Sequence, residues 1–258
     1  MQGKGHGWGQ EHRTRVQDGS GQRQVIRHKL GMKTISSLVL LATVPGILGQ
    51  IDMKGKAFSF YRKDSGPVEI SPKTFETFTA FTLCLKTCTN LTENMLMFKL
   101  FDMVNMNKFA MLLDANPSTF TGADLLIFYE DLQMSFHFPN TDANKWRSIC
   151  VAFDSNSGRL LFWLNGKLYQ SEDVQKGLTD FVPMSIIIGR SFAGEEHSAV
   201  AQITDVNMWS TVLMSHDIER FITNKVTGDV INWRLLNYKT RGVVTIEPNH
   251  CSEHSWNL

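Results

Sequence analysis

The sequence has no strong excess of charge of either sign. Its 258 residues include 26 Lys and Arg and 25 Asp and Glu, which gives a formal net charge of +1 at pH 7. Proteins that bind the phosphate backbone of nucleic acids usually present a basic surface, so the composition gives no reason to expect a nucleic-acid partner. A hydrophobic content of 42% is enough for one or two domains with a buried core.

The sequence also lacks the motifs that accompany common catalytic chemistry. It has no G-x-S-x-G nucleophile elbow, no phosphate-binding loop and no H-E-x-x-H zinc motif. Sandwich-shaped glycosidases need two carboxylates at a defined separation, whereas the adjacent Glu130 and Asp131 would point to opposite faces of a strand. His137 is predicted to be a strand residue rather than a base. We therefore expect a protein that is not an enzyme.

No apolar run is long enough to cross a membrane comfortably. The run from Ile35 to Leu48 is shorter than the roughly 20 residues that a membrane-spanning helix needs. It follows Lys33 and ends in small residues before Gln50, which is the layout of a secretory signal peptide. We predict a signal peptide over residues 32–49 and a secreted, extracellular protein without a membrane span. A buried strand or an uncleaved anchor is the alternative.

Residues 1–31 are rich in Gly, Gln and Arg and show no apolar periodicity. Such a segment cannot bury enough apolar surface to become ordered, so we predict a disordered or non-native extension. Without residues 1–49 the chain has seven fewer basic and two fewer acidic residues and is mildly acidic. Because there is no repeat, Pro-rich linker or second boundary in residues 50–258, one domain is expected there.

Cysteine is scarce, and all four cysteines lie beyond the predicted signal peptide: Cys84, Cys88, Cys150 and Cys251. Their spacing does not fit a zinc site, and an exported chain meets an oxidising compartment, so we expect disulfides. Four cysteines allow three connectivities, and the residues alone do not choose among them. Asn90 begins an N-x-T sequence and is a candidate glycosylation site.

Short apolar runs separated by polar clusters predict an all-β protein. The clearest segment predicts three antiparallel strands over Arg147–Phe153, Arg159–Leu164 and Lys167–Tyr169, joined at Asp154–Gly158 and at Asn165-Gly166. The other predicted strands are Ala57–Tyr61, Phe78–Lys86, Leu96–Phe101, Phe109–Leu113, Leu125–Tyr129, Met134–Phe138, Met184–Gly189 and Gln202–Trp209.

Period-2 alternation in "FTLCLK" places Phe81, Leu83 and Leu85 on one face of a strand and Cys84 on the other. Trp163 and Trp209 are expected in the core of the sandwich. One helix is predicted over Ser215–Thr223, with Ser215 as its N-cap.

Several segments together resemble the short pentraxin family: "FTLCLK", "ICVAFDSNSGRLLFWLNGK", "SIIIGRSF", "DVNMWSTVL" and "VINWRLLNYKTRG". The resemblance implies an antiparallel jelly-roll β-sandwich, related to concanavalin A, with one long helix on a face. It also implies a cyclic homo-oligomer, usually a pentamer, and a Cys84–Cys150 disulfide. By closing that loop, the disulfide would add about 4 kcal/mol to the free energy of unfolding, because it lowers the entropy of the unfolded chain. The family pattern supplies no partner for Cys88 or Cys251, which could pair with each other, pair between protomers or stay free.

The resemblance further implies two calcium ions per protomer and calcium-dependent ligands such as phosphocholine or polysaccharides. Calcium needs six to eight oxygen ligands, but this sequence departs from the family at the ligand positions. Arg190 and the residues after it stand in place of an acidic run, and Met106-Asn107 aligns with an Asp-Asn pair. An alternative register would bring Asp114 or Asp124 to the site.

The remaining candidates follow from family position. The candidate metal ligands are Asn107, Glu195 and Glu196, and the candidate ligand-binding residues are Phe109, Leu112, Arg190 and His197. A pocket lined by Phe109 and Leu112 is one interpretation, and a place in the core is the other. We therefore expect a secreted pattern-recognition protein of innate immunity with a degraded calcium site. The alternative is a monomeric, laminin-G-like adhesion module.

Overall fold

The computed structural model describes residues 50–61, 65–89, 93–101, 107–114, 122–139, 144–174, 182–183, 185–189 and 200–251, with the backbone alone at Asn107 and Pro139. The predicted extension and signal peptide, residues 1–49, lie outside these ranges. The candidate glycosylation site Asn90 lies outside them as well.

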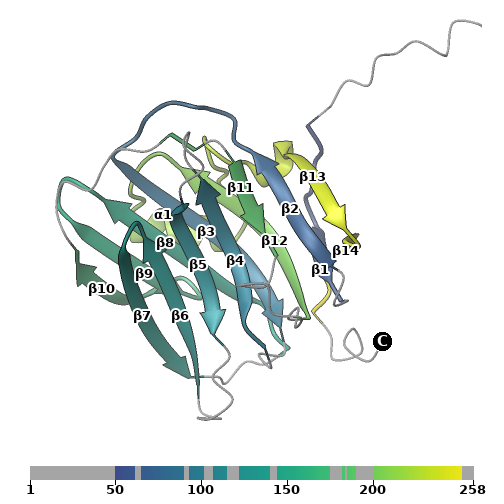
Figure 1. The fold of residues 1–258 in the computed structure, drawn as a ribbon, viewed down its shortest axis with the longest axis horizontal. Helices are drawn as coiled ribbons and strands as arrows, with labels where there is room; N and C mark the ends of the chain where they lie inside the picture. Colours follow the sequence, from purple (N-terminus) through teal and green to yellow (C-terminus); the bar gives the residue numbers. More distant parts are fainter. Residues whose placement is uncertain are drawn as a thin grey trace, which may run out of the picture. The chain divides into compact units, whose positions relative to one another are not determined.

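The described residues form two antiparallel seven-stranded sheets that pack face to face (Figure 1). Sheet I has the order β10 (Lys167–Asp173), β9 (Arg159–Leu164), β8 (Arg147–Asp154), β3 (Ala80–Thr89), β12 (Ala201–Trp209), β1 (Lys56–Phe60) and β14 (Thr245–Pro248). Sheet II has the order β13 (Asn237–Gly242), β2 (Ser65–Ser71), β11 (Ser185–Ile188), β4 (Met95–Phe101), β5 (Asn107–Asp114), β6 (Gly122–Tyr129) and β7 (Leu132–Pro139). The predicted all-β antiparallel sandwich is confirmed.

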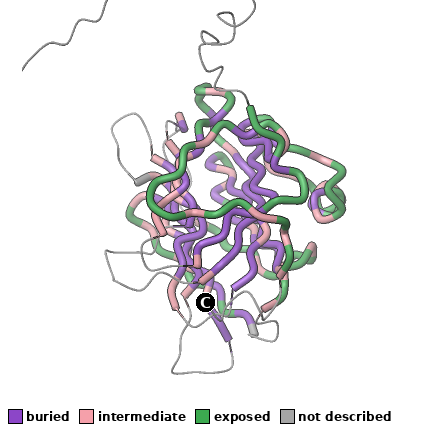
Figure 2. The backbone as a smooth tube through the Cα atoms, turned by 90° about the vertical axis from the view of Figure 1, so that its right-hand side faces the viewer, coloured by how far each residue is buried: buried purple, intermediate pink, exposed green. Residues whose placement is uncertain are grey.

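The core lies between the two sheets and is dominated by aromatic and branched side chains. Phe81, Leu83 and Leu85 of β3 point into it, as the alternation in "FTLCLK" predicts. Phe81 meets Phe109 of sheet II edge to face, with ring centroids 5.0 Å apart. In Figure 2 the buried residues gather in the interior, and the exposed residues follow the outer parts of the tube. Each such side chain, when fully buried, contributes about 1.5–3 kcal/mol to folding.

A second, smaller core lies on the outer face of sheet I, beneath the helix. It contains the Cys84–Cys150 disulfide together with Trp163 and Trp209. The prediction that these two tryptophans fill the space between the sheets is therefore wrong. Trp163 pairs with Cys150 across the ladder, so it shares the outward face of that cysteine.

The predicted three-strand ribbon is present as β8, β9 and β10. Its turns use backbone conformations that few residues adopt: Asn165 and Gly166 have φ of +50° and +83°, as a type I′ turn requires. Asp154 closes the other turn by accepting hydrogen bonds from the Asn156 N–H at 3.0 Å and the Ser157 hydroxyl at 2.8 Å. Strand β10 continues to Asp173, beyond the predicted end at Tyr169.

Helix α1 (Ser215–Ile222) is the one α-helix among the described residues, and at eight residues it is shorter than the family resemblance implies. Its N-cap is Met214, not the predicted Ser215, and no side chain caps the helix there. Ile218 and Phe221 are buried against sheet I. The short 3-10 helix η2 (Trp233–Leu235) follows, and its Trp233 lies in the core between the sheets.

Candidate functional site

Strand β5 carries three of the predicted ligand residues and separates them. Asn107 is its first residue and pairs with Phe101 of β4. Phe109 is 1% exposed and packs in the core against Phe81. Leu112 lies three positions further along, on the opposite face of the strand, because side chains alternate. The interpretation that Phe109 and Leu112 line one pocket is therefore wrong.

Leu112 belongs to an apolar strip on the outer face of sheet II. Leu96, Ala110 and Leu112 are buried there, with Leu126 and Phe128 packed against them. Polar pairs surround this strip. The Lys108 ammonium lies 2.8 Å from the Glu130 carboxylate, and the Asp124 carboxylate lies 2.7 Å from Nδ1 of His137.

Asp114 and Asp124, the carboxylates that an alternative register would offer to calcium, pair directly across β5 and β6. His137 engages Asp124 from β7, so it is a strand residue, as predicted. Glu130 and Asp131 lie in the turn between β6 and β7 rather than along a strand. They cannot form the carboxylate pair of a glycosidase across a sheet.

The other candidate ligands, Arg190, Glu195, Glu196 and His197, lie outside the described residues. Within the described ranges, no group of three or more His, Cys, Asp or Glu side chains has the geometry to hold a metal ion. Because calcium takes six to eight oxygens, a calcium site on this face would need the undescribed residues as ligands.

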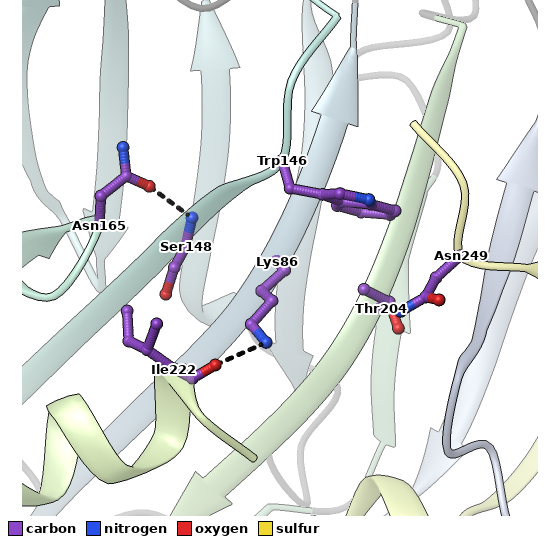
Figure 3. Close-up of a pocket in the computed structure, with 7 residues that line it drawn as sticks. All are labelled: Lys86, Trp146, Ser148, Asn165, Thr204, Ile222 and Asn249. Carbon is purple, nitrogen blue, oxygen red and sulfur yellow. Dashed lines mark hydrogen bonds between the residues drawn. The ribbon is translucent and has the colours of Figure 1, made fainter. Parts of the chain in front are cut away.

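The outer face of sheet I holds a pocket of about 310 Å³ that the sequence did not indicate (Figure 3). It lies beside the end of α1 and is lined by Lys86, Trp146, Ser148, Asn165, Thr204, Ile222 and Asn249.

The Lys86 ammonium forms one wall of this pocket and is fully engaged. It donates to the Asp205 carboxylate at 2.8 Å, to the Ile222 carbonyl at 3.1 Å and to the Asn224 amide oxygen at 3.0 Å. Asp205 reaches it from a bulge in β12, where the residue holds a φ of +54°. These contacts use all three N–H groups of the ammonium.

Ser148 also lines the pocket, and the described residues do not satisfy all of its hydrogen-bonding groups. Its backbone N–H donates to the Asn165 side-chain oxygen at 3.0 Å. Its hydroxyl is buried and has no hydrogen-bond partner among the described residues. A buried polar group without a hydrogen-bond partner lowers stability by about 1–3 kcal/mol. A ligand that forms a hydrogen bond with this hydroxyl would therefore bind more tightly.

A polar network lies on the same face of sheet I, where β1, β12 and β14 are neighbours. The Glu247 carboxylate accepts hydrogen bonds from the hydroxyls of Ser59 and Tyr61 and from the Gln202 amide. Partial burial raises the pKa of Glu247, but these hydrogen bonds outweigh that effect and hold its pKa below the ordinary value of 4.5.

The second disulfide joins Cys88 of β3 to Cys251, which leaves no free cysteine in the described part of the chain. It fixes the segment after β14 on the outer face of sheet I. Asn249, two residues before Cys251, lines the pocket from this segment. Cys84 and Cys88 share a strand face, and this was the one signal in the sequence for the position of the second bridge.

Comparison with known proteins places these observations in a family. The Pentaxin family profile matches residues 56–248. Mucosal pentraxin from Mus musculus is 32% identical over 223 residues, which cover 84% of this chain and 97% of that protein. C-reactive protein from Xenopus laevis is 31% identical over 225 residues, covering 83% and 92%.

Among solved structures, the native heptameric SAP-like pentraxin from Limulus polyphemus superposes with a TM-score of 0.67 at 17% identity. The match covers 78% of this chain and 99% of the Limulus chain. Within the described residues, no helix combines the length and the apolar character that crossing a bilayer requires.

Proposed function

Since the chain belongs to the pentaxin family, whose members are binding proteins rather than enzymes, we propose that it is a secreted, homo-oligomeric pattern-recognition protein of innate immunity with a reduced calcium-dependent ligand site. The observation that carries the proposal is the sequence after Gly189. There the family resemblance implies an acidic run, and this chain has Arg190-Ser191-Phe192-Ala193-Gly194.

Charge explains why this change weakens calcium binding. An acidic cluster is stable only when a cation neutralises it, and the cation needs six to eight oxygens. Arg190 instead adds a positive charge and supplies no oxygen ligand. Asn107, Glu195 and Glu196 remain as candidate ligands, and Arg190 and His197 remain as candidate ligand-binding residues, with Leu112 on the outer face of sheet II. Phosphocholine-like or glycan ligands would therefore bind weakly, or without calcium.

Calorimetric titration of Ca²⁺ into the secreted chain tests the site. We expect no saturable binding of two ions at micromolar affinity. Arg190→Glu removes the cation and adds a carboxylate, so we expect it to strengthen Ca²⁺ binding. The double variant Glu195→Gln with Glu196→Gln is the matched opposite change. It removes two carboxylates, so we expect it to weaken any Ca²⁺ binding that remains. Binding of two calcium ions to the unmodified chain at micromolar affinity would contradict the proposal that its calcium site is reduced.

Light scattering after size exclusion tests the assembly. A cyclic oligomer gives a multiple of the protomer mass, and we expect a pentamer, while the name of the Limulus structure records a heptamer for that protein. A monomer in calcium-containing buffer would favour the laminin-G-like adhesion module instead. The two measurements are independent, so one part of the proposal can fail without the other.

A further inference from the structure

The pocket beside α1 is separate from Leu112, a residue to which the family resemblance assigns ligand binding. Leu112 belongs to the outer face of sheet II. Lys86, Ser148 and Thr204 instead face outward from sheet I, on the other side of the sandwich. The pocket therefore needs its own explanation.

The electrostatics of the pocket favour a neutral ligand. Lys86 is the one charged side chain among the described lining residues. Its charge is compensated by Asp205 at 2.8 Å, and its three N–H groups are already donated to protein oxygens. An incoming anion would gain no hydrogen bond from this ammonium and would be repelled by the Asp205 carboxylate.

The remaining lining groups suit a ligand that carries hydroxyls on a flat apolar frame. Trp146 offers a half-buried indole, whose electron-rich face attracts polarised C–H groups. Asn165 and Asn249 add side-chain amides, and Ser148 adds its buried hydroxyl, which no described residue engages. In Figure 3, Trp146 and Asn249 border one side of the pocket, and Ser148 and Asn165 border the other.

The walls of the pocket are held in place before any ligand arrives. Asn249 is fixed by the Cys88–Cys251 disulfide, and Asn165 is fixed in a type I′ turn by its bond to the Ser148 N–H. Such preorganisation lowers the entropic cost of binding. The volume of about 310 Å³ lies at the lower end of the range of about 300–1,000 Å³ for small-molecule sites, which suits one sugar ring.

We propose that this pocket binds one neutral sugar unit of a glycan, without calcium. An aromatic face, two amides and a buried hydroxyl, in a described lining whose one charge is compensated by Asp205, match the alternating C–H and O–H groups of a sugar ring. The hydroxyl of Ser148, now unsatisfied, would gain its partner from the ligand.

An array of immobilised oligosaccharides, probed with the secreted chain in EDTA, tests this proposal. It carries neutral glycans that end in hexose or N-acetylhexosamine, with sialylated and sulfated counterparts beside them. We expect retention on a subset of the neutral glycans and no gain from added anionic groups. Retention on the anionic glycans alone, or on none, would overturn the proposal.

Two variants assign the binding to the pocket, measured as the affinity for the best neutral glycan. Trp146→Ala removes the stacking face and should weaken binding roughly tenfold or more. Tyr169→Ala, at an exposed aromatic side chain on β10 of the same sheet, is the matched control and should leave the affinity unchanged. Equal affinities for the original chain and for Trp146→Ala would place the binding elsewhere.

Ser148→Ala separates a binding role from a structural one. Because its hydroxyl has no partner among the residues that the structure describes, its removal should leave the melting temperature unchanged or raise it, while glycan affinity falls severalfold. A variant that melts lower and binds equally well would show that the hydroxyl serves folding alone.

Discussion

The ammonium nitrogen of Lys86 lies 2.8 Å from the carboxylate of Asp205, across the β3–β12 pair and at the bulge in β12. Their side chains are 15% and 11% exposed, so both charges are largely removed from water. The bulge gives Asp205 a positive φ and directs its side chain toward Lys86. The same ammonium reaches the C-terminal end of α1 through the Ile222 carbonyl, so this pair links the sheet to the helix.

Lys86→Met should lower the free energy of unfolding by about 2–3 kcal/mol, because it leaves a largely buried carboxylate without its cation. Urea unfolding measures the change. The double variant Lys86→Met with Asp205→Asn should lose less free energy of unfolding than the sum of the two single losses, because the unpaired carboxylate is removed as well. Additive losses would show that the pair is not coupled.

Glu247 predicts a pH dependence of stability. Its folded-state pKa lies below the ordinary 4.5, so its contribution is fully present above that value and is lost as the pH falls through the folded pKa. The difference in unfolding free energy between the original chain and Glu247→Gln should therefore shrink steadily as the pH falls below about 4.5.

Tyr61→Phe supplies the control for that measurement. It removes one donor to the Glu247 carboxylate, so it should bring the pKa of Glu247 closer to its ordinary value and reduce the pH dependence. A difference between the original chain and Glu247→Gln that stays constant from pH 7 to pH 3 would contradict the assigned hydrogen bonds.

Local patterns in the sequence were sufficient to predict most of the strands. Alternation identified the inward face of β3, and Asn165-Gly166 identified the β9–β10 hairpin. Strand β2 was missed because Gly66 and Pro67 resemble a turn. In the structure Gly66 lies so close to β13 that a Cβ atom would be 2.0 Å from the Arg241 carbonyl oxygen. Glycine is needed there for contact between strands, a long-range requirement that no local pattern contains.

The candidate sites were less predictable than the fold. Family position suggested one pocket for Phe109 and Leu112, but the strand period places their side chains on opposite faces of β5. The pocket beside α1 combines residues from six segments between Lys86 and Asn249. The register of sheet I, the packing of α1 on that sheet and the second disulfide bring these residues together, and none of these can be read from neighbouring residues.

Gly166→Ala should destabilise the protein more than Gly55→Ala. Both glycines have positive φ, +83° and +71°, so alanine costs about 1–2 kcal/mol at either position. At Gly166 the new Cβ would also lie 3.1 Å from Cδ1 of Ile222, whereas at Gly55 nothing lies within 4 Å.

Thermal unfolding of the two variants measures this difference. Ile222→Val removes Cδ1 and with it the close contact. It should therefore destabilise the Gly166→Ala variant less than it destabilises the original chain. Equal destabilisation by Gly166→Ala and Gly55→Ala would show that the Ile222 side chain can move away from the new Cβ without a loss of stability.

Removing the Cys88–Cys251 disulfide by the double change Cys88→Ala and Cys251→Ala should destabilise the chain and loosen one edge of sheet I. The bridge closes a loop of 163 residues, for which chain entropy gives about 5 kcal/mol as an upper estimate. Its local effect should fall on β14, which pairs only with β1 among the described strands and is continuous with Cys251.

Hydrogen exchange distinguishes this local effect from general destabilisation. Amides of Thr245–Pro248 should exchange faster in the double variant under native conditions, while those of β8 and β9 keep their protection. Cys84→Ala with Cys150→Ala is the matched control. It removes a bridge buried beneath α1, so exchange should increase around the helix instead of at β14. Unchanged protection of β14 in the first variant would show that pairing with β1 alone holds the edge strand, and that Asn249 is not positioned by the disulfide.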